Sequence, residues 1–210
     1  MIRVLIADDH AIVREGLKQI LSEIPDMMVV DEAFDGEEAL RKTQTDTWDV
    51  LVLDLAMPGR SGLDILEQLK GTHPWRPVLV LSMHAEEMYA VRVLKAGASG
   101  YLIKESTPYE LVKAIRKVLS GGKYVSASLA ETLALRLDET GDRPLHEALS
   151  DREFQVLCMM ASGKTVTEVA GELSLSVKTV STYRARMLEK LNLRNSAEAI
   201  RYAVDHRLVD

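Results

Sequence analysis

What this sequence lacks already narrows its class. It has a single cysteine, Cys158, so no disulfide can form within the chain, as is usual for a protein of a reducing compartment. No run comes near the roughly 20 apolar residues that cross a membrane, and no long apolar stretch follows Met1 that would direct export. We therefore expect a cytoplasmic protein with no membrane partner, in which Cys158 fills a core position.

The sequence also lacks a strong excess of either positive or negative charge. The net charge is -6 over 210 residues, divided as -5 in residues 1–122, -2 in 123–149 and +1 in 150–210. Within residues 178–194, however, five basic side chains face a single acidic one, Glu189, for a local net charge of +4. The five are Lys178, Arg184, Arg186, Lys190 and Arg194. Such a cluster indicates a nucleic-acid partner for this segment.

The first 122 residues predict a domain of their own, since a chain with 47% hydrophobic residues can bury two small cores. Short apolar runs alternate there with amphipathic stretches, which is typical of an α/β domain whose parallel sheet is covered by helices on both faces. The predicted strands are 4–7, 28–31, 50–53, 78–81 and 100–103, and the predicted helices are 11–24, 37–43, 62–69, 87–96 and 108–119. We predict a doubly wound, five-stranded (βα)5 domain over residues 1–122.

Residues 123–148 are predicted to connect this domain to a second one. A short helix is expected at 128–137, where apolar residues recur at helical spacing. The polar run at 138–144, which contains a glycine and ends in a proline, is typical of a flexible hinge. This segment is therefore expected to be a linker.

Residues 149–210 carry only helical patterns. Two hydroxyl residues each precede a glutamate by three positions, the spacing at which the two side chains satisfy backbone amides at a helix start. These pairs are Ser150 with Glu153 and Thr165 with Glu168. Further helices are predicted at 177–191 and from about residue 196. We expect an all-α domain of four helices.

Polar side chains stand at the ends of four predicted strands. Asp8 and Asp9 follow the first strand, Asp54 the third, Ser82 the fourth and Lys104 the fifth. The carboxyl ends of parallel strands meet at one edge of a sheet, where ligands bind. Grouped carboxylates repel each other and call for a cation, and oxygen ligands suit Mg²⁺. With a lysine and a hydroxyl to hold further oxygens, the site predicts phosphoryl transfer to a carboxylate.

Each of these residues also has a simpler interpretation. The aspartates could cap the helices that follow them, and Lys104 could pair with any of them. In order and spacing, however, they resemble the receiver domain family over about 120 residues. The match consists of the acidic pair 8–9, Asp-Leu-Ala-Met-Pro-Gly at 54–59, Ser82, and Gly-Ala-x-Gly-Tyr-Leu-x-Lys at 97–104. The resemblance implies that Asp54 accepts a phosphoryl group from a sensor histidine kinase.

The resemblance also implies a set of Mg²⁺ ligands. Asp9 would bind the ion directly and Asp8 mainly through water, while Asp54 and the backbone carbonyl of Ala56 would complete the ligands. Ala56 has no polar side chain to position a hydrolytic water, and the bulky Met83 could shield Asp54. We therefore expect the phosphoryl group to be long-lived.

For the phosphoryl group itself, the resemblance implies contacts with Ser82 and Lys104. Tyr101 would change rotamer as Ser82 moves, although a packing role for this aromatic is an equal alternative. Glu105 follows Lys104 where many receivers have proline. A cis bond at this peptide would cost about 3 to 4 kcal/mol instead of less than about 1, which puts its geometry in question.

The predicted helix at 177–191 has one apolar and one polar face. At 100° per residue, its core side would hold Val180, Tyr183, Met187 and Leu191. Short hydrogen-bonding side chains and cations lie on and beside the opposite face, as suits a helix in the DNA major groove. We expect phosphate contacts from Lys178, Thr179 and Arg186, and base contacts from Ser181 and Thr182. A solvated helix face is the alternative.

Residues 150–208 resemble the LuxR-type helix-turn-helix. The matching segments are Leu-Ser-x-Arg-Glu-x-x-Val-Leu at 149–157 and Ser-x-Lys-Thr-Val-x-x-Tyr at 176–183. With a receiver ahead of it, this arrangement resembles the NarL/FixJ class of response regulators. The resemblance implies a transcription factor that binds double-stranded DNA when phosphorylated.

A homodimer is expected in the active state. The modest charge of the helical domain predicts weak binding by one copy, so two copies on adjacent half-sites are needed. The family's usual dimer contact would fall on the fourth helix at Ala199, Ile200 and Ala203. These three residues could equally belong to the core.

Two other functions remain open. Phosphatases of the haloacid dehalogenase type also form an aspartyl phosphate, but they place a second aspartate two residues later, where this chain has Ala56. A receiver fold could also act as a docking module that a partner controls in place of phosphate. The sequence favours a response regulator that is not a multiple-turnover enzyme.

Overall fold

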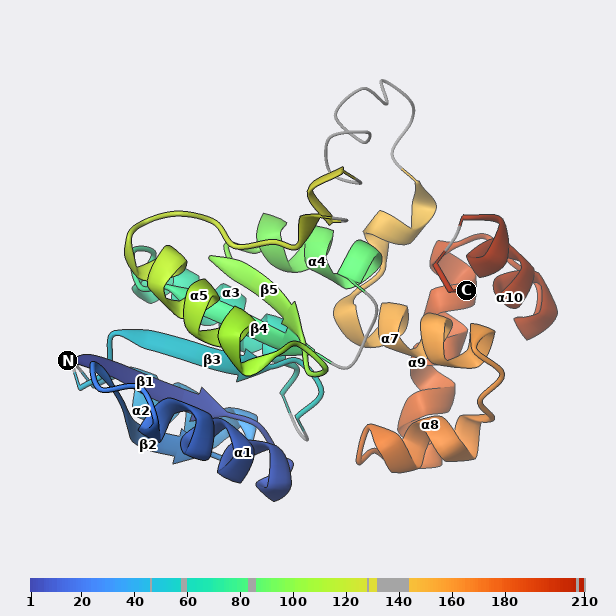
Figure 1. The fold of residues 1–210 in the computed structure, drawn as a ribbon. Helices are drawn as coiled ribbons and strands as arrows, with labels where there is room; N and C mark the ends of the chain where they lie inside the picture. Colours follow the sequence, from blue (N-terminus) through green and yellow to red (C-terminus); the bar gives the residue numbers. More distant parts are fainter. Residues whose placement is uncertain are drawn as a thin grey trace. The chain divides into compact units, whose positions relative to one another are not determined.

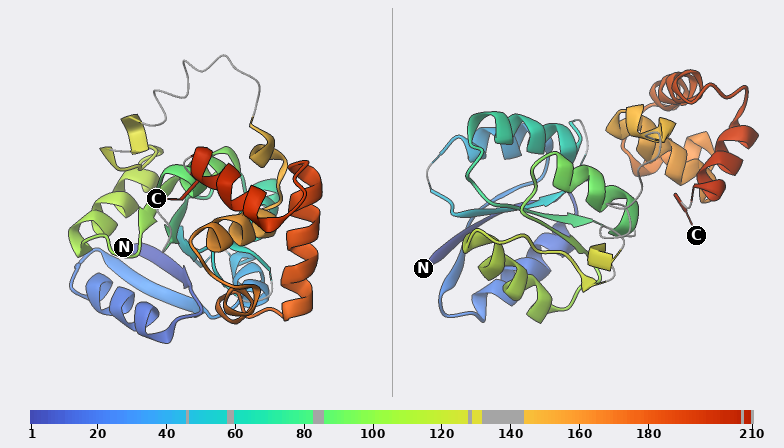
Figure 2. Two further views of the ribbon diagram at one scale, coloured as in Figure 1. Left: turned by 90° about the vertical axis from the view of Figure 1, so that its right-hand side faces the viewer. Right: turned by 90° about the horizontal axis from the view of Figure 1, so that it is seen from above.

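The computed structural model describes residues 1–45, 47–57, 60–82, 86–127, 129–131, 144–206 and 208–209. The chain forms two compact units, residues 1–139 and 140–210, whose elements are traced in Figures 1 and 2. The division falls inside the segment predicted to be a linker. No helix in the described part of the chain is both long enough and apolar enough to cross a bilayer.

A parallel sheet of five strands forms the centre of the first unit. The strands are β1 (Ile2–Ala7), β2 (Met27–Ala33), β3 (Val50–Asp54), β4 (Val78–Ser82) and β5 (Gly100–Ile103). Their order is β2-β1-β3-β4-β5, and every neighbouring pair is parallel. All residues of β3 and β4 are buried, as their continuous apolar runs require of strands covered on both faces. The predicted doubly wound α/β fold is confirmed.

Within the described residues, five helices cover the two faces of this sheet. They are α1 (Ala11–Ser22), α2 (Gly36–Thr43), α3 (Gly62–Thr72), α4 (Glu86–Lys95) and α5 (Pro108–Leu119). Helices α1 and α5 lie on one face and α2, α3 and α4 on the other (Figure 2). Leu17 and Leu21 of α1 and Ile115 of α5 pack with strand residues such as Ile6 and Val52 in one core cluster. The apolar stripes of the helices thus bury the sheet that carries the candidate site.

The first unit continues past the predicted boundary at residue 122. The amide of Tyr124 donates to the carbonyl of Ser99 at 3.0 Å, and the amide of Tyr101 donates to the carbonyl of Tyr124 at 3.0 Å. Tyr124 therefore pairs with the outer edge of β5 and satisfies backbone groups that an edge strand would otherwise expose. Of the predicted helix at 128–137, residues 129–131 are helical. Residues 128 and 132–143 lie outside the described part.

The second unit is helical, as predicted. It contains the short 3₁₀ helix η1 (Leu145–Ala148) and the helices α7 (Asp151–Ala161), α8 (Val166–Glu172), α9 (Val177–Lys190) and α10 (Ser196–Asp205). Both predicted capping boxes are present, at the starts of α7 and α8. Val156, Val169, Leu173 and Val180 pack together, so α7, α8 and α9 share a core. The 3₁₀ helix was not predicted, because so short a turn leaves no periodicity in a sequence.

Gly62 determines how closely α3 approaches the end of β3. A Cβ atom at this position would lie 2.4 Å from the carbonyl oxygen of Asp54 and 2.6 Å from Cα of Leu55. Backbone atoms cannot move aside as a flexible side chain can. We predict that Gly62→Ala lowers the free energy of unfolding of the first unit by about 1–3 kcal/mol, the usual cost of overpacking.

Urea unfolding followed by tryptophan fluorescence measures this effect, because both tryptophans, Trp48 and Trp75, lie in the first unit. Gly71→Ala on the same helix is the control, since a Cβ there has nothing within 4 Å and alanine favours the helix. Equal unfolding midpoints for the two variants would contradict the close contact at Gly62.

Candidate functional site

The ends of β1 and β3 lie side by side at the carboxyl edge of the sheet, where Ala7 pairs with Leu53. The chain leaves β1 for α1 on one face of the sheet and leaves β3 for α3 on the other (Figure 2). Where two connections diverge in this way, a doubly wound sheet leaves room for a ligand. Asp8 follows Ala7, and Asp54 is the last residue of β3. Both predicted carboxylates therefore stand at this point.

Lys104, which follows β5, joins the two carboxylates. Its Nζ lies 2.7 Å from Asp8 Oδ2 and 2.8 Å from Asp54 Oδ2. The other oxygen of Asp54 accepts a hydrogen bond from the amide of Ala56 at 3.2 Å, and the other oxygen of Asp8 accepts one from the amide of His10 at 2.8 Å. Three residues from three strand ends thus form one buried, hydrogen-bonded ionic cluster.

Burial sets the electrostatics of this cluster. The side chains of Asp8, Asp54 and Lys104 are only 2%, 1% and 5% exposed. Burial raises the pKa of Asp54 above its usual value, and the neighbouring Asp8 adds to this, while Lys104 opposes both. Burial by itself lowers the pKa of Lys104, but Asp54 and Asp8 outweigh it, so that this pKa is raised. The ammonium ion of Lys104 therefore opposes the effect of burial and favours the ionised form of Asp54.

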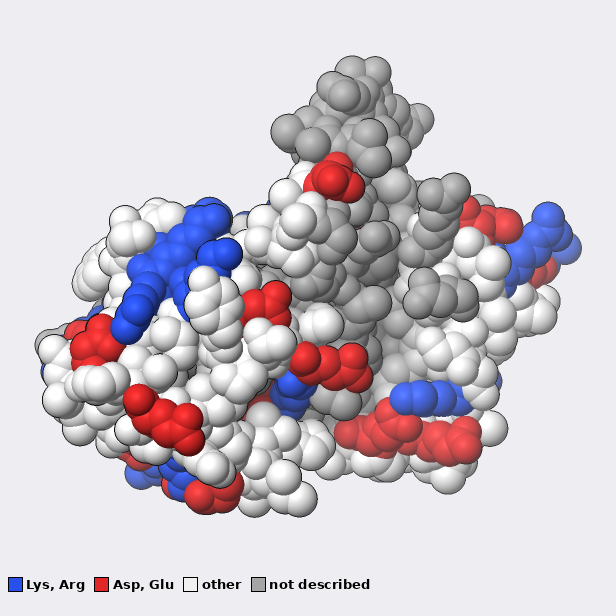
Figure 3. All heavy atoms as spheres, in the orientation of Figure 1, with Lys and Arg blue, Asp and Glu red and all other residues white. Residues whose placement is uncertain are grey.

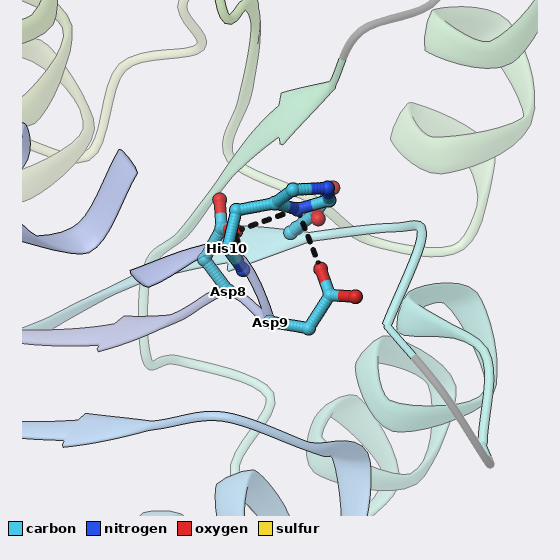
Figure 4. Close-up of side chains that lie close together, drawn as sticks. Asp8, Asp9 and His10 are labelled. Atoms are coloured by element: carbon cyan, nitrogen blue, oxygen red, sulfur yellow. Dashed lines mark hydrogen bonds and ion pairs between the residues drawn. The ribbon is translucent and has the colours of Figure 1, made fainter. Parts of the chain in front are cut away.

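Asp9 and His10 extend the cluster toward solvent (Figure 4). His10 Nδ1 lies 2.7 Å from Asp9 Oδ1 and 3.3 Å from Asp8 Oδ1. One ligand atom from each of Asp8, Asp9, His10 and Asp54 lies within 4.8 Å of the others. The three carboxylates predicted to hold a divalent cation are therefore close enough to share one. His10 was not predicted, although its position directly after the acidic pair was a signal.

Ser82 and Tyr101 occupy buried positions beside the cluster. Ser82 is the last residue of β4 and is 1% exposed, and its carbonyl accepts a hydrogen bond from the amide of Lys104 at 2.8 Å. Tyr101 of β5 has no exposed surface, which is compatible with the packing alternative. Its rotamer change with Ser82 stays a prediction, as does the carbonyl contact of the half-buried Ala56.

Two expectations concerned the surroundings of the site: the geometry of the peptide bond after Lys104 and the shielding of Asp54 by Met83. No cis peptide bond occurs among the described residues, so the bond between Lys104 and Glu105 is trans. Met83, Pro58 and Gly59 lie outside the described residues. The shielding of Asp54 by Met83 stays a prediction.

Helix α9 has the two faces that its sequence predicted. Val180, Met187 and Leu191 are buried, while Tyr183 is half-buried against the core. The predicted DNA contacts lie on the outer side: Lys178, Thr182 and Arg186 are exposed, and Thr179 and Ser181 are half-buried. The hydroxyl of Ser176 accepts from the amide of Thr179 at 3.0 Å and so begins the helix.

The cationic cluster of this segment is smaller than the sequence suggested. Lys190 Nζ lies 2.7 Å from Glu153 Oε2, and Glu153 is 3% exposed at the start of α7. Glu189 is therefore not the only acidic partner, because packing brings in a second carboxylate from 37 positions earlier.

Over α8, acidic and basic side chains adjoin (Figure 3), and Lys164 pairs with Glu172 at 2.5 Å.

The predicted dimer contact on α10 needs a correction. Ala199 and Ala203 are 2% and 0% exposed, and their helix packs against α7. A partner cannot touch side chains that are already in the core of their own unit, so these two assignments were wrong and the core alternative holds. Ile200 is half-buried. Its contact with a partner stays a prediction.

Comparison with known protein families matches both units. Residues 4–116 match the family described as the response regulator receiver domain. Residues 147–203 match the family described as bacterial regulatory proteins of the luxR family. Residues 1–3, 117–146 and 204–210 lie outside the two matches.

Curated relatives match over the whole chain. The response regulator UvrY of Escherichia coli K12 is 38% identical over 209 residues, which cover 99% of this chain and 96% of the relative. The response regulator GacA of Pseudomonas viridiflava is 39% identical over 212 residues, with 100% and 99% covered. Among solved structures, RcsB of Salmonella enterica serovar Typhimurium, bound to the promoter rprA with the phosphomimetic BeF3-, is 30% identical with a TM-score of 0.63. That match covers 96% of this chain and 97% of the other.

The pair formed by Lys190 and Glu153 yields a stability prediction for the second unit. Because Lys190 is partly exposed, its ion pair with Glu153 stabilises the second unit by about 1 kcal/mol at most. Lys190→Gln should therefore raise the population of the opened, unfolded form of this unit about fivefold. Cys158, the chain's single thiol, is buried in α7 and reports such opening. We expect it to react about fivefold faster with a thiol reagent in this variant.

Lys178→Gln is the matched control, because it removes the same charge from an exposed position on the same helix. Its thiol reactivity should equal that of the unaltered chain. If both variants label at the unaltered rate, the ion pair contributes nothing to the stability of this unit.

Proposed function

The chain belongs to the response regulators that join a receiver domain to a LuxR-type DNA-binding domain, and we propose that Asp54 is the phosphoacceptor through which it is controlled. It is thus a transcription regulator by family. The observation that carries the proposal is the buried Asp54 carboxylate, which pairs with Lys104 Nζ at 2.8 Å at the switch point of the sheet. A buried carboxylate that is paired with an ammonium ion and lies next to further carboxylates suits the acceptance of a phosphoryl group, whose transfer is assisted by a divalent cation.

The residues at this edge fit a Mg²⁺ ion. Carboxylate oxygens of Asp8, Asp9 and Asp54 lie within reach of one centre, and hard oxygen ligands are those that Mg²⁺ prefers. These three residues, with the Ala56 carbonyl, would hold the ion, with Asp9 binding directly and Asp8 mainly through water. When bound, Mg²⁺ supplies positive charge that offsets the phosphoryl oxygens.

The chain's own residues account for the transfer step. A carboxylate oxygen of Asp54 attacks the phosphorus of a phosphohistidine on a sensor histidine kinase. The new P–O bond forms as the P–N bond breaks, and the imidazole of the kinase leaves with the electron pair. Lys104 and Ser82 then bind the phosphoryl oxygens, which carry about two negative charges. Tyr101 follows the movement of Ser82.

DNA recognition is assigned to α9. Lys178, Thr179 and Arg186 contact phosphates, and Ser181 and Thr182 contact base edges. RcsB, which shares this architecture, is described as bound to its promoter in the presence of a phosphomimetic. By this likeness, phosphorylation of the chain favours a DNA-bound homodimer in which Ile200 of α10 lies at the contact.

The alternatives are less well supported. A haloacid dehalogenase type of phosphatase needs an acid two residues after its nucleophile, and Ala56 cannot serve. We therefore propose that the chain accepts one phosphoryl group and is not a multiple-turnover enzyme. The families matched do not favour a docking module. That idea would require beryllofluoride with Mg²⁺ to leave both dimerisation and DNA affinity unchanged.

Replacement of the phosphoacceptor tests the proposal directly. We predict that Asp54→Asn takes up no label from a radioactive small phosphodonor in the presence of Mg²⁺, because an amide cannot act as the nucleophile. We expect Lys104→Ala to abolish the phosphorylation-dependent rise in DNA affinity.

Asp49→Asn is the control, since Asp49 precedes the same strand at its opposite end and pairs with Arg3 at 2.7 Å. This variant should take up label as the unaltered chain does. Labelling of Asp54→Asn at the unaltered rate would show that the acceptor lies elsewhere.

A second prediction separates positioning contacts from sequence readout. Lys178→Gln should weaken binding to all DNA sequences and reduce the slope of log affinity against log salt by about one. Thr182→Ala should instead change the preference among operator variants, by about 1–3 kcal/mol for the base it reads. Fluorescence anisotropy at several salt concentrations measures both effects.

Lys190→Gln is the control for the charge effect, because Glu153 already neutralises Lys190. Its salt slope should stay that of the unaltered chain. Equal losses on random and specific DNA for both Lys178→Gln and Thr182→Ala would contradict the division of roles.

A further inference from the structure

His10 contributes a nitrogen to a site that otherwise offers only oxygens. Its Nδ1 points at Asp9 Oδ1 and Asp8 Oδ1, at 2.7 and 3.3 Å (Figure 4). The side chain of His10 is 58% exposed, so it can adjust without disturbing the core. Its backbone is held, because its amide donates to Asp8 Oδ1 at 2.8 Å. The imidazole is thus anchored at the mouth of the acidic cluster.

The spacing of these three atoms is that of neighbouring ligands around one metal ion. An ion with ligands at about 2.1 Å in octahedral geometry has adjacent ligands about 3 Å apart. The separations of 2.7 and 3.3 Å lie on either side of this value. Lys104 binds the other oxygen of Asp8, Oδ2, and leaves Oδ1 directed to the imidazole. A cation bound directly by Asp9 would therefore find the imidazole nitrogen beside that ligand, with Asp8 Oδ1 next to both.

A nitrogen ligand strengthens the preference of a site for divalent transition metals over Mg²⁺. Mg²⁺ prefers carboxylate, carbonyl and water, whereas an imidazole suits divalent transition metals. Affinity for a site that includes nitrogen rises from Mn²⁺ through Co²⁺ to Ni²⁺. Coordination through Nδ1 requires that this atom carry no proton. The proton is released to water or re-enters the ring at Nε2.

We propose that His10 is a metal ligand through Nδ1, which lets the acidic site hold a divalent transition-metal ion such as Co²⁺ or Mn²⁺ more tightly than Mg²⁺. The proposal rests on the proposed function, since it takes the site at Asp8, Asp9 and Asp54 to be the cation site of the receiver. It makes this selectivity greater than that of the three carboxylates alone. The alternative is that His10 only donates a hydrogen bond and positions Asp9.

Calorimetric titration of the tag-free full chain with Co²⁺ and with Mg²⁺ tests the proposal, because the two ions are similar in size and differ in their affinity for nitrogen. We expect His10→Ala and His10→Asn each to weaken Co²⁺ binding at least about tenfold, because loss of even an outer-shell partner of a metal ligand typically costs that much. Mg²⁺ binding should change less than about twofold. The asparagine retains a hydrogen-bond donor, so it separates ligation from the positioning of Asp9.

Proton NMR of the Co²⁺-loaded chain supplies a second readout. A coordinated imidazole gives a strongly shifted, exchangeable Nε2–H signal, which should be present in the unaltered chain and absent from both His10 variants. His73→Ala is the matched control, because His73 is a half-buried histidine far along the chain, after α3. This variant should keep both the signal and the Co²⁺ affinity.

The outcomes separate the two proposals. If Asp9→Asn leaves both affinities unchanged, the acidic cluster is not the cation site, and the magnesium part of the proposed function fails. If Asp9→Asn weakens both ions but the His10 variants weaken Co²⁺ and Mg²⁺ equally, or weaken neither, His10 is not a ligand. The absence of a shifted imidazole signal in the unaltered chain would also overturn the inference.

Discussion

Two buried carboxylates that share one lysine impose the main constraint on the first unit. Asp8 and Asp54 lie almost wholly out of water, where their repulsion would be costly without the Nζ of Lys104 within 2.8 Å of each. The three residues come from three strand ends, so the contact exists only when the strands have their native order. The same contact opposes the rise in the pKa of Asp54 that burial causes, and so favours the charged form of this carboxylate.

The packing around the cluster serves this arrangement. Gly62 allows α3 to begin directly against the end of β3, and the carbonyl of Ser82 holds the amide of Lys104 at the end of β5. A charge added at Asp54 would therefore act on Ser82 and Lys104, which are linked at the ends of the neighbouring strands β4 and β5. Such a linkage gives a local change of charge a route to the surface of the unit.

A second buried carboxylate plays a structural part in the helical unit. Glu153 caps α7, where it accepts from the amide of Ser150 at 2.7 Å, and it pairs with Lys190 near the end of α9. The bonds to Lys190 and Ser150 outweigh burial and hold the pKa of Glu153 below its usual value. This pair joins the start of one helix to the end of another. Lys178 and Arg186 of α9 remain exposed.

The sequence by itself determined the succession of strands and helices along the chain, the capping boxes and the strand-end positions of Asp8, Asp54, Ser82 and Lys104. These features depend on periodicity and on contacts between residues a few positions apart, so a linear reading reaches them. Only the tertiary structure decided that Lys190 is paired, that Ala199 and Ala203 face inward, and that His10 turns toward the aspartates. Such outcomes depend on which distant surfaces pack together, and packing is a property of the folded chain.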